Sequence, residues 1–302
     1  MRSRGLGAAP LPCPMIRDYL KLHLVIVAWG FTAILGKLIT LPAVEVVAWR
    51  TALAALGFAW VAKLTKRSLH IPTREKRWMI FMGGILGLHW ILFFLSARLA
   101  NASVCLAAMP TMMIWCSLIE PWVDGSRRWR PLELIVGAVI VAAVWMIFKV
   151  EMRYWQGLSV GLLAAFLAAI FSVFNKQIVA RCHYAVMGTY QMTGALIVSV
   201  LGWLWLTPGQ VTLPDWENVL WLLMLSSICT VWAYAGYMEV LQRMSVFTVN
   251  VIYNLEPVYG IALAALIFGS QEYMSRGFYI GASIIIGSVL LVPWLSRLTK
   301  RR

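Results

Sequence analysis

Residues 18–39 of the chain read DYLKLHLVIVAWGFTAILGKLI. This apolar stretch is long enough to cross the hydrocarbon core of a bilayer, which takes about 20 helical residues at 1.5 Å each. Further apolar stretches of similar length follow, and short polar breaks separate them. Together they predict an all-α integral membrane protein with ten transmembrane helices, at 18–39, 44–62, 78–97, 102–122, 132–148, 157–176, 186–206, 219–241, 246–268 and 278–295.

The composition also favours a membrane protein. Hydrophobic residues make up 61% of the chain and charged residues 13%, whereas a soluble protein carries about a quarter charged residues. The net charge of +14 would suggest nucleic-acid binding in a soluble protein. Here the basic residues fall mostly at helix ends, where they meet phospholipid headgroups. We therefore expect the lipid bilayer as a partner and no nucleic acid.

The distribution of Lys and Arg predicts the orientation, because positively charged loops stay cytoplasmic. With the N-terminus inside, most of the 26 Lys and Arg residues fall in cytoplasmic segments. The outer segments then hold only Arg98, Lys149, Arg153 and Arg276. We expect a multi-pass protein of the plasma (inner) membrane with both termini cytoplasmic.

Both ends of the chain read as short cytoplasmic tails. Residues 1–17 lack the apolar core of a signal peptide, and Met15 is an alternative start of the protein. Residues 296–302 form a basic tail after the last span.

The ten spans divide into two halves of five, residues 18–148 and 157–295. An odd number of spans per half inverts the second half relative to the first, as in many transporters. Short matches relate the halves: Gly36-Lys37 with Asn175-Lys176, His89-Trp90 with Val231-Trp232, and Gly137-Ala138 with Gly281-Ala282. Small residues at four-residue spacing predict close helix packing at Gly83/Gly87, Gly157/Gly161 and Gly277/Gly281.

Several segments resemble the drug/metabolite transporter superfamily, specifically the EamA-type permeases. The segments are Ala28-Trp29-Gly30-Phe31 running to Lys37, Arg50 in the second span, residues 97–103 continuing to Pro110, Leu255-Glu256-Pro257-Val258, and Phe268-Gly269. The chain departs from many relatives at residues 269–272, where Ser and Gln separate Gly269 from Glu272. The resemblance implies two inverted EamA-like repeats around a central cavity that includes Trp29, with solutes moved by alternating access and often exported.

Glu256 is the most informative polar residue, because a charge near mid-membrane is costly. Pro257 follows it and removes a backbone donor, which predicts an interrupted helix. Tyr253 is three residues earlier, on the same helix face. Glu256 either binds a cationic or amino group and exchanges a proton, or stays protonated and fixes the kink. Pro110 predicts a second kink, in the fourth span.

Lys37 and Arg50 lie near the outer ends of the first two spans. They either form an electropositive vestibule for a carboxylate or phosphate, or extend to the interface as long basic side chains do. Glu239 and Arg243 have the spacing of an intrahelical ion pair.

His89 and Trp90 in the third span and Trp232 in the eighth mark two aromatic regions. They either line a cavity for an aromatic or amphipathic solute, or pack between helices. His89 is a helix–helix hydrogen-bond donor or a proton relay.

These features favour a secondary transporter, and we expect an exporter of small metabolites such as amino acids or related amphipathic solutes. Proton coupling is a further expectation. The alternatives are a channel, a lipid scramblase or, less favoured, an integral membrane enzyme. The scattered histidines and acids give no catalytic or metal-binding pattern, so we expect no enzyme activity, metal or cofactor.

Overall fold

The computed structural model describes residues 16–123, 131–179, 182–206, 213–241, 243–244, 249 and 252–299. Every secondary-structure element in this part of the chain is helical, which confirms the predicted class. Met15 with most of the N-terminal tail, the loop arginines at 127, 128 and 130, and the start of the ninth span lie outside the described residues.

The first half contains four apolar helical segments that are long enough to cross a membrane. Their elements, with the shorter helices of this half, are α1 (Ile16–Leu38), α2 (Ala43–Leu64), α3 (Thr73–Leu99), α4 (Ala102–Ala108), the 3₁₀ turn η1 (Met109–Thr111), α5 (Met112–Val123) and α6 (Pro131–Val150). In α6, the apolar stretch 135–150 is shorter than the other spans.

The second half contains three such segments among its described residues. Its elements are the 3₁₀ turn η2 (Met152–Tyr154), α7 (Trp155–Val179), α8 (Tyr184–Leu206), α9 (Trp216–Ser226), the π-helix η3 (Ser227–Trp232), α10 (Ala233–Leu241), α12 (Glu256–Phe268), the 3₁₀ turn η4 (Gly269–Glu272) and α13 (Arg276–Thr299). Within the described residues, seven segments in all meet the length and hydropathy of a membrane span. The total of ten crossings stays a prediction.

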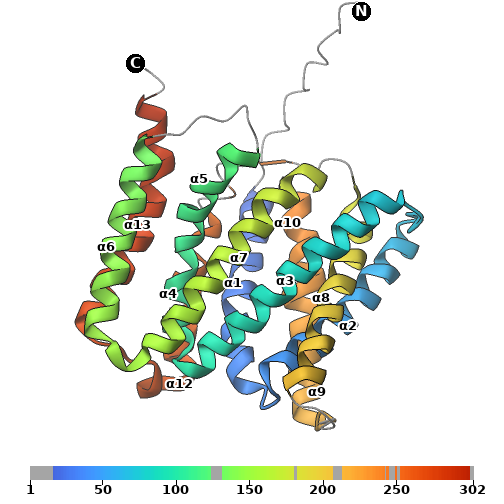
Figure 1. The fold of residues 1–302 in the computed structure, drawn as a ribbon, viewed down its shortest axis with the longest axis horizontal. Helices are drawn as coiled ribbons and strands as arrows, with labels where there is room; N and C mark the ends of the chain where they lie inside the picture. The colour runs from blue at the N-terminus through green and yellow to red at the C-terminus, as the bar shows by residue number, and fades with distance from the viewer. Residues whose placement is uncertain are drawn as a thin grey trace, which may run out of the picture.

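Helices from the two halves pack against one another rather than forming separate bodies. The main contacts join α2 to α8, α3 to α7 and α8, α6 to α13, and α1 to α12. In Figure 1, α6 and α13 stand together at one edge, while α2, α8 and α9 lie toward the other.

Large apolar side chains cover the outside of the protein. Trp122, Trp205 and Leu266 are each more than four-fifths exposed. A surface of this kind in water would associate or aggregate, whereas lipid solvates it. With the apolar spans, it identifies a multi-pass membrane protein.

The predicted close approaches of small residues are confirmed. A Cβ atom on Gly83 or Gly87 in α3 would collide with the backbone of Gln191 or Ala195 in α8. Two further pairs make similarly close contacts: Gly157/Gly161 and Gly277/Gly281. Close backbone approach increases the van der Waals contact that holds helices together in lipid.

Three interruptions divide the long helical segments. Pro110 lies in η1 between α4 and α5, as its position predicts. The π-helix η3 separates α9 from α10. A turn at Asn254 and Leu255 precedes α12, and Pro257 occupies its first turn. Each interruption frees backbone groups from the regular helical pattern.

Candidate functional site

Glu256 begins α12 directly after the turn at Asn254 and Leu255. This turn lies next to Pro257, from which a helix break was predicted. The Glu256 side chain is buried, with an exposed fraction of 7%. Its carboxyl group interacts with the side chain of Tyr253, three residues earlier.

Aromatic side chains from α1 and α10 pack against Tyr253, the neighbour of this carboxyl group. The ring of Trp29 lies 5.3 Å from that of Tyr237 and 5.7 Å from that of Tyr253, between ring centroids. Trp29, Tyr237, Tyr253 and Glu256 are called the Glu256 cluster below. The structure therefore brings together three residues that the sequence singled out, and it adds Tyr237.

Two glycines allow α1 to approach the start of α12. A Cβ atom on Gly30 would lie 3.0 Å from the carbonyl oxygen of Glu256 and 3.0 Å from the nitrogen of Gly260. Any larger residue at either position would therefore push the two backbones apart. Because Gly30 and Gly260 lack side chains, α1 lies close to α12, and Trp29 is the residue next to Gly30.

Arg50 occupies a separate buried position in α2, with an exposed fraction of 3%. Its guanidinium carbon lies 3.8 Å from the ring centroid of Trp90 and 5.8 Å from that of Phe94. Its Nε donates a hydrogen bond of 2.9 Å to Oγ1 of Thr230 in η3. We call Arg50, Trp90, Phe94 and Thr230 the Arg50 cluster. This burial rules out the alternative that Arg50 extends to the interface.

His89 connects α3 to α7. Its Nδ1 lies 2.8 Å from the carbonyl oxygen of Ala164. A carbonyl oxygen only accepts, so Nδ1 carries the hydrogen and donates it. This contact is the helix–helix hydrogen bond that was one of the two interpretations of His89.

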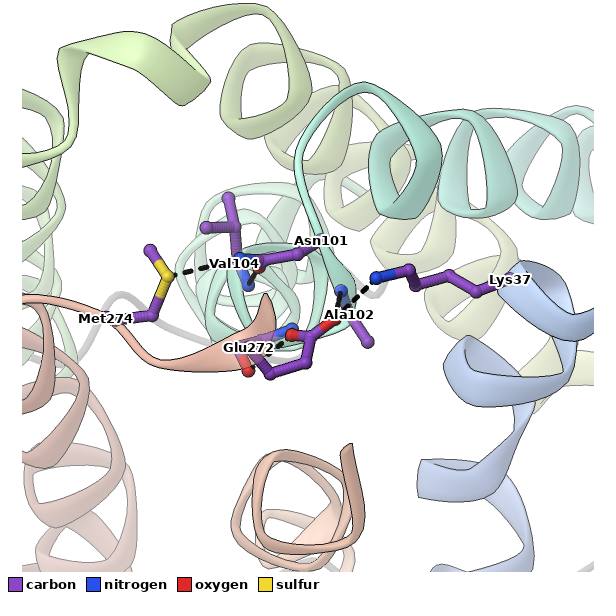
Figure 2. Close-up of polar contacts among 7 residues, drawn as sticks. Lys37, Asn101, Ala102, Val104, Glu272 and Met274 are labelled. Carbon is purple, nitrogen blue, oxygen red and sulfur yellow. Dashed lines mark hydrogen bonds and ion pairs between the residues drawn. The ribbon is translucent and has the colours of Figure 1, made fainter. Parts of the chain in front are cut away.

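Lys37 has an acidic partner that its sequence position does not reveal. Its Nζ lies 2.8 Å from Oε1 of Glu272, whose side chain is fully buried, and 4.5 Å from the ring centroid of Phe268. Figure 2 shows Lys37 reaching Glu272 from α1, beside the start of α4. Lys37 and Arg50 thus contact different groups, and the charge of Lys37 is paired.

Glu272 also caps α4. Its carboxylate accepts hydrogen bonds from the backbone nitrogens of Ala102, at 3.1 Å, and Ser103, at 2.9 Å, and from the Ser103 hydroxyl. Asn101 provides the cap for Val104 in the same turn. Negative charge is favourable at a helix N-terminus, where unpaired amides point outward. The sequence signal was weak, because Glu272 lies far along the chain from both Lys37 and α4.

The predicted ion pair between Glu239 and Arg243 is replaced by contacts with α1. Lys21 pairs with Glu239, and Arg243 Nη1 lies 3.1 Å from Oδ1 of Asp18. Because α10 packs on α1, each side chain meets an opposite charge across the interface rather than one turn away.

Trp232 stands apart from both clusters. It closes the π-helix η3 and has an exposed fraction of 41%. Neither the Glu256 cluster nor the Arg50 cluster includes it. Among the described residues, no three His, Cys, Asp or Glu side chains come together as metal ligands would.

Comparison with known proteins gives a likeness in fold and a family match for the second half of the chain. A crystal structure of another protein superimposes on the chain with a TM-score of 0.66, covering 93% of this chain and 98% of that one. The sequence identity is 16%, so this likeness concerns the fold alone. No curated protein matches the sequence. A model described as the EamA-like transporter family matches residues 155–294 in the second half of the chain.

Proposed function

We propose that this protein is a secondary transporter that exports small metabolites such as amino acids or related amphipathic solutes. The observation that carries this proposal is the EamA-like transporter domain at residues 155–294. Export is the direction that the resemblance of the whole chain implies. The solute crosses by alternating access, and the protein does no catalysis.

Helix packing supports a ten-span architecture of two inverted repeats. Helix α1 of the first half packs on α12 of the second half. Helix α7, which corresponds to α1, packs on α4 and α5 of the first half. Likewise α3 packs on α7, and α10, which corresponds to α3, packs on α1. Exchanging the two halves therefore reproduces the same neighbours, as expected for inverted repeats.

The orientation follows from charge. Basic residues concentrate on one set of loops, so both termini lie in the cytoplasm and the protein lies in the plasma (inner) membrane. Ion pairs then join α1 to its neighbours near both ends of the helix. They are Lys21–Glu239 and Asp18–Arg243 at the cytoplasmic end and Lys37–Glu272 at the outer end.

The Glu256 cluster supplies the polar group on the solute pathway. An amino or cationic group can pair with the carboxylate, and the rings of Trp29, Tyr237 and Tyr253 can attract the same cation through their faces. The helix break at Asn254 resembles the interrupted helices that transporters use near their binding sites. Proton exchange at Glu256 would couple transport to the proton gradient.

Counterflow in proteoliposomes tests the proposal. The purified full-length protein is reconstituted, loaded with an unlabelled metabolite from a panel of amino acids and aromatic amines, and supplied with a trace of the labelled form outside. A carrier accumulates label transiently, and uptake saturates with concentration. Conductance without saturation would instead indicate a channel, and movement of labelled lipid between leaflets a scramblase.

A further inference from the structure

We propose that Arg50 binds the carboxylate group of the transported solute, an inference that rests on the proposed transport function. The ligand class is a small organic monoanion or zwitterion whose apolar part lies near Trp90 and Phe94.

Arg50 carries a buried charge with neutral partners. Its guanidinium contacts the hydroxyl of Thr230 and the faces of two aromatic rings. Among the described residues, no acid forms an ion pair with it, and Nη1 and Nη2 donate no hydrogen bond to the protein. A guanidinium at this depth in a membrane protein is costly without an anion. A bound anion therefore accounts for its position.

The π-helix η3 fixes the direction of the guanidinium. The Thr230 hydroxyl donates to the carbonyl oxygen of Leu225, at 2.8 Å, five residues earlier. Its lone pair is then free to accept the hydrogen of Arg50 Nε. Isolated π-helical turns occur frequently at functional sites. Here the turn holds Nε and leaves the two terminal nitrogens for a ligand.

The donor geometry favours a carboxylate. Two terminal nitrogens of one guanidinium match the two oxygens of a carboxylate as parallel hydrogen bonds. Lys37 is paired with Glu272 and so adds no unbalanced positive charge to that of Arg50. A monoanion balances that charge, whereas a phosphate dianion would need further cations.

Thermal unfolding of the purified full-length protein in lipid nanodiscs tests this assignment. Three carboxylates are each compared with the matching amide: acetate with acetamide, benzoate with benzamide, and L-phenylalanine with L-phenylalaninamide. We expect at least one carboxylate to raise the unfolding temperature while its amide does not, because only a ligand of the native state stabilises it. Sodium chloride and sodium phosphate are run at equal ionic strength. Equal stabilisation by each carboxylate and its amide, or by chloride or phosphate, would overturn the proposal.

Variants locate the site. Arg50→Gln should abolish the preference for carboxylate over amide. Arg50→Lys keeps the charge but loses the paired donors, and should weaken half-maximal stabilisation about tenfold. Thr230→Val removes the acceptor of the Arg50 Nε hydrogen bond and leaves Arg50 itself unchanged. It should weaken carboxylate binding less than Arg50→Lys does. The control is Arg153→Gln, at an arginine with an exposed side chain, which should behave as the native protein.

If Arg50→Gln does not fold, the native protein and Thr230→Val still decide the question. Retention of the carboxylate preference in Arg50→Gln, or full affinity in Thr230→Val, would contradict the inference. Counterflow of neutral or cationic solutes without a carboxylate preference would reject this inference alone. Carboxylate binding without counterflow would instead reject the proposed transport.

Discussion

Lys37 in α1 and Glu272 in η4 form an ion pair with 2.8 Å between Nζ and Oε1. The same carboxylate accepts the first amides of α4, so a single side chain joins three segments from both halves of the chain. The Lys37 side chain is 21% exposed, whereas that of Glu272 is fully buried.

Removing the charge of Glu272 should destabilise the protein more than removing that of Lys37. Glu272→Gln leaves the ammonium without its counter-ion and weakens the cap of α4, at a cost of about 3 kcal/mol or more. Lys37→Gln leaves the carboxylate with its backbone donors and should cost less. Thermal unfolding of both variants and of the double variant measures their coupling. An unchanged unfolding temperature for Glu272→Gln would show that the carboxylate does not hold these segments together.

The contact of α1 with α12 should not tolerate a side chain at Gly30. Gly30→Val would place its Cβ 3.0 Å from two backbone atoms of α12 and separate the helices, which costs about 1–3 kcal/mol in a well-packed core. Gly287→Val in α13 is the matched control, because its Cβ would meet nothing within 4 Å. Unfolding temperatures compare the two. Equal tolerance of both substitutions would mean that the close approach is not maintained in the membrane.

Glu256→Gln should remove the pH dependence of transport, because an amide cannot take up or release a proton. Counterflow in proteoliposomes at several pH values measures this, with insertion checked by the yield of folded protein. Tyr253→Phe is the control that removes only the hydroxyl bound to Glu256. Normal transport with unchanged pH dependence in Glu256→Gln would assign Glu256 to the helix break alone.

His183 should make the protein less stable in acid. Burial, and secondarily the charge of Arg67, lower the pKa of His183, which precedes α8. Its neutral Nδ1 accepts a hydrogen bond from the backbone nitrogen of Ala185, at 3.3 Å. The unfolded chain therefore binds the proton more readily, so the stabilisation is present above about pH 6.5 and is lost as pH falls.

Unfolding temperatures between about pH 7.5 and pH 5 test this dependence on His183. His183→Asn keeps an acceptor side chain at the start of α8 but does not titrate in this range. Its unfolding temperature should fall less with acid than that of the native protein. The same slope in both would assign the acid sensitivity to other groups.

The positions of the helices were predictable because hydropathy acts locally. Each predicted span corresponds to a described helical segment or to part of one. The differences lie at the ends. α3 begins at Thr73 rather than at 78, because its polar first turn continues the helix beyond the apolar stretch from which the span was predicted. Breaks at Pro110 and Pro257 were also predicted, since proline lacks a backbone donor, but Pro121 lies within α5 without a break.

The partners of the charged residues could not be predicted in the same way. Local spacing suggested Glu239 with Arg243, yet both residues pair with α1. Lys37 and Glu272 are separated by most of the chain. Arg50 contacts Thr230 because the π-helix η3 turns the Thr230 side chain toward α2.

The sequence by itself therefore determined that the protein is helical, lies in a membrane and has helix breaks predicted at two prolines. A segment that crosses lipid must be apolar over about 20 residues and must satisfy its own backbone hydrogen bonds. The tertiary structure alone decided which buried charges are neutralised. Coulomb and hydrogen-bond energies depend on distances of a few ångströms between helices, and those distances are set only when the helices pack.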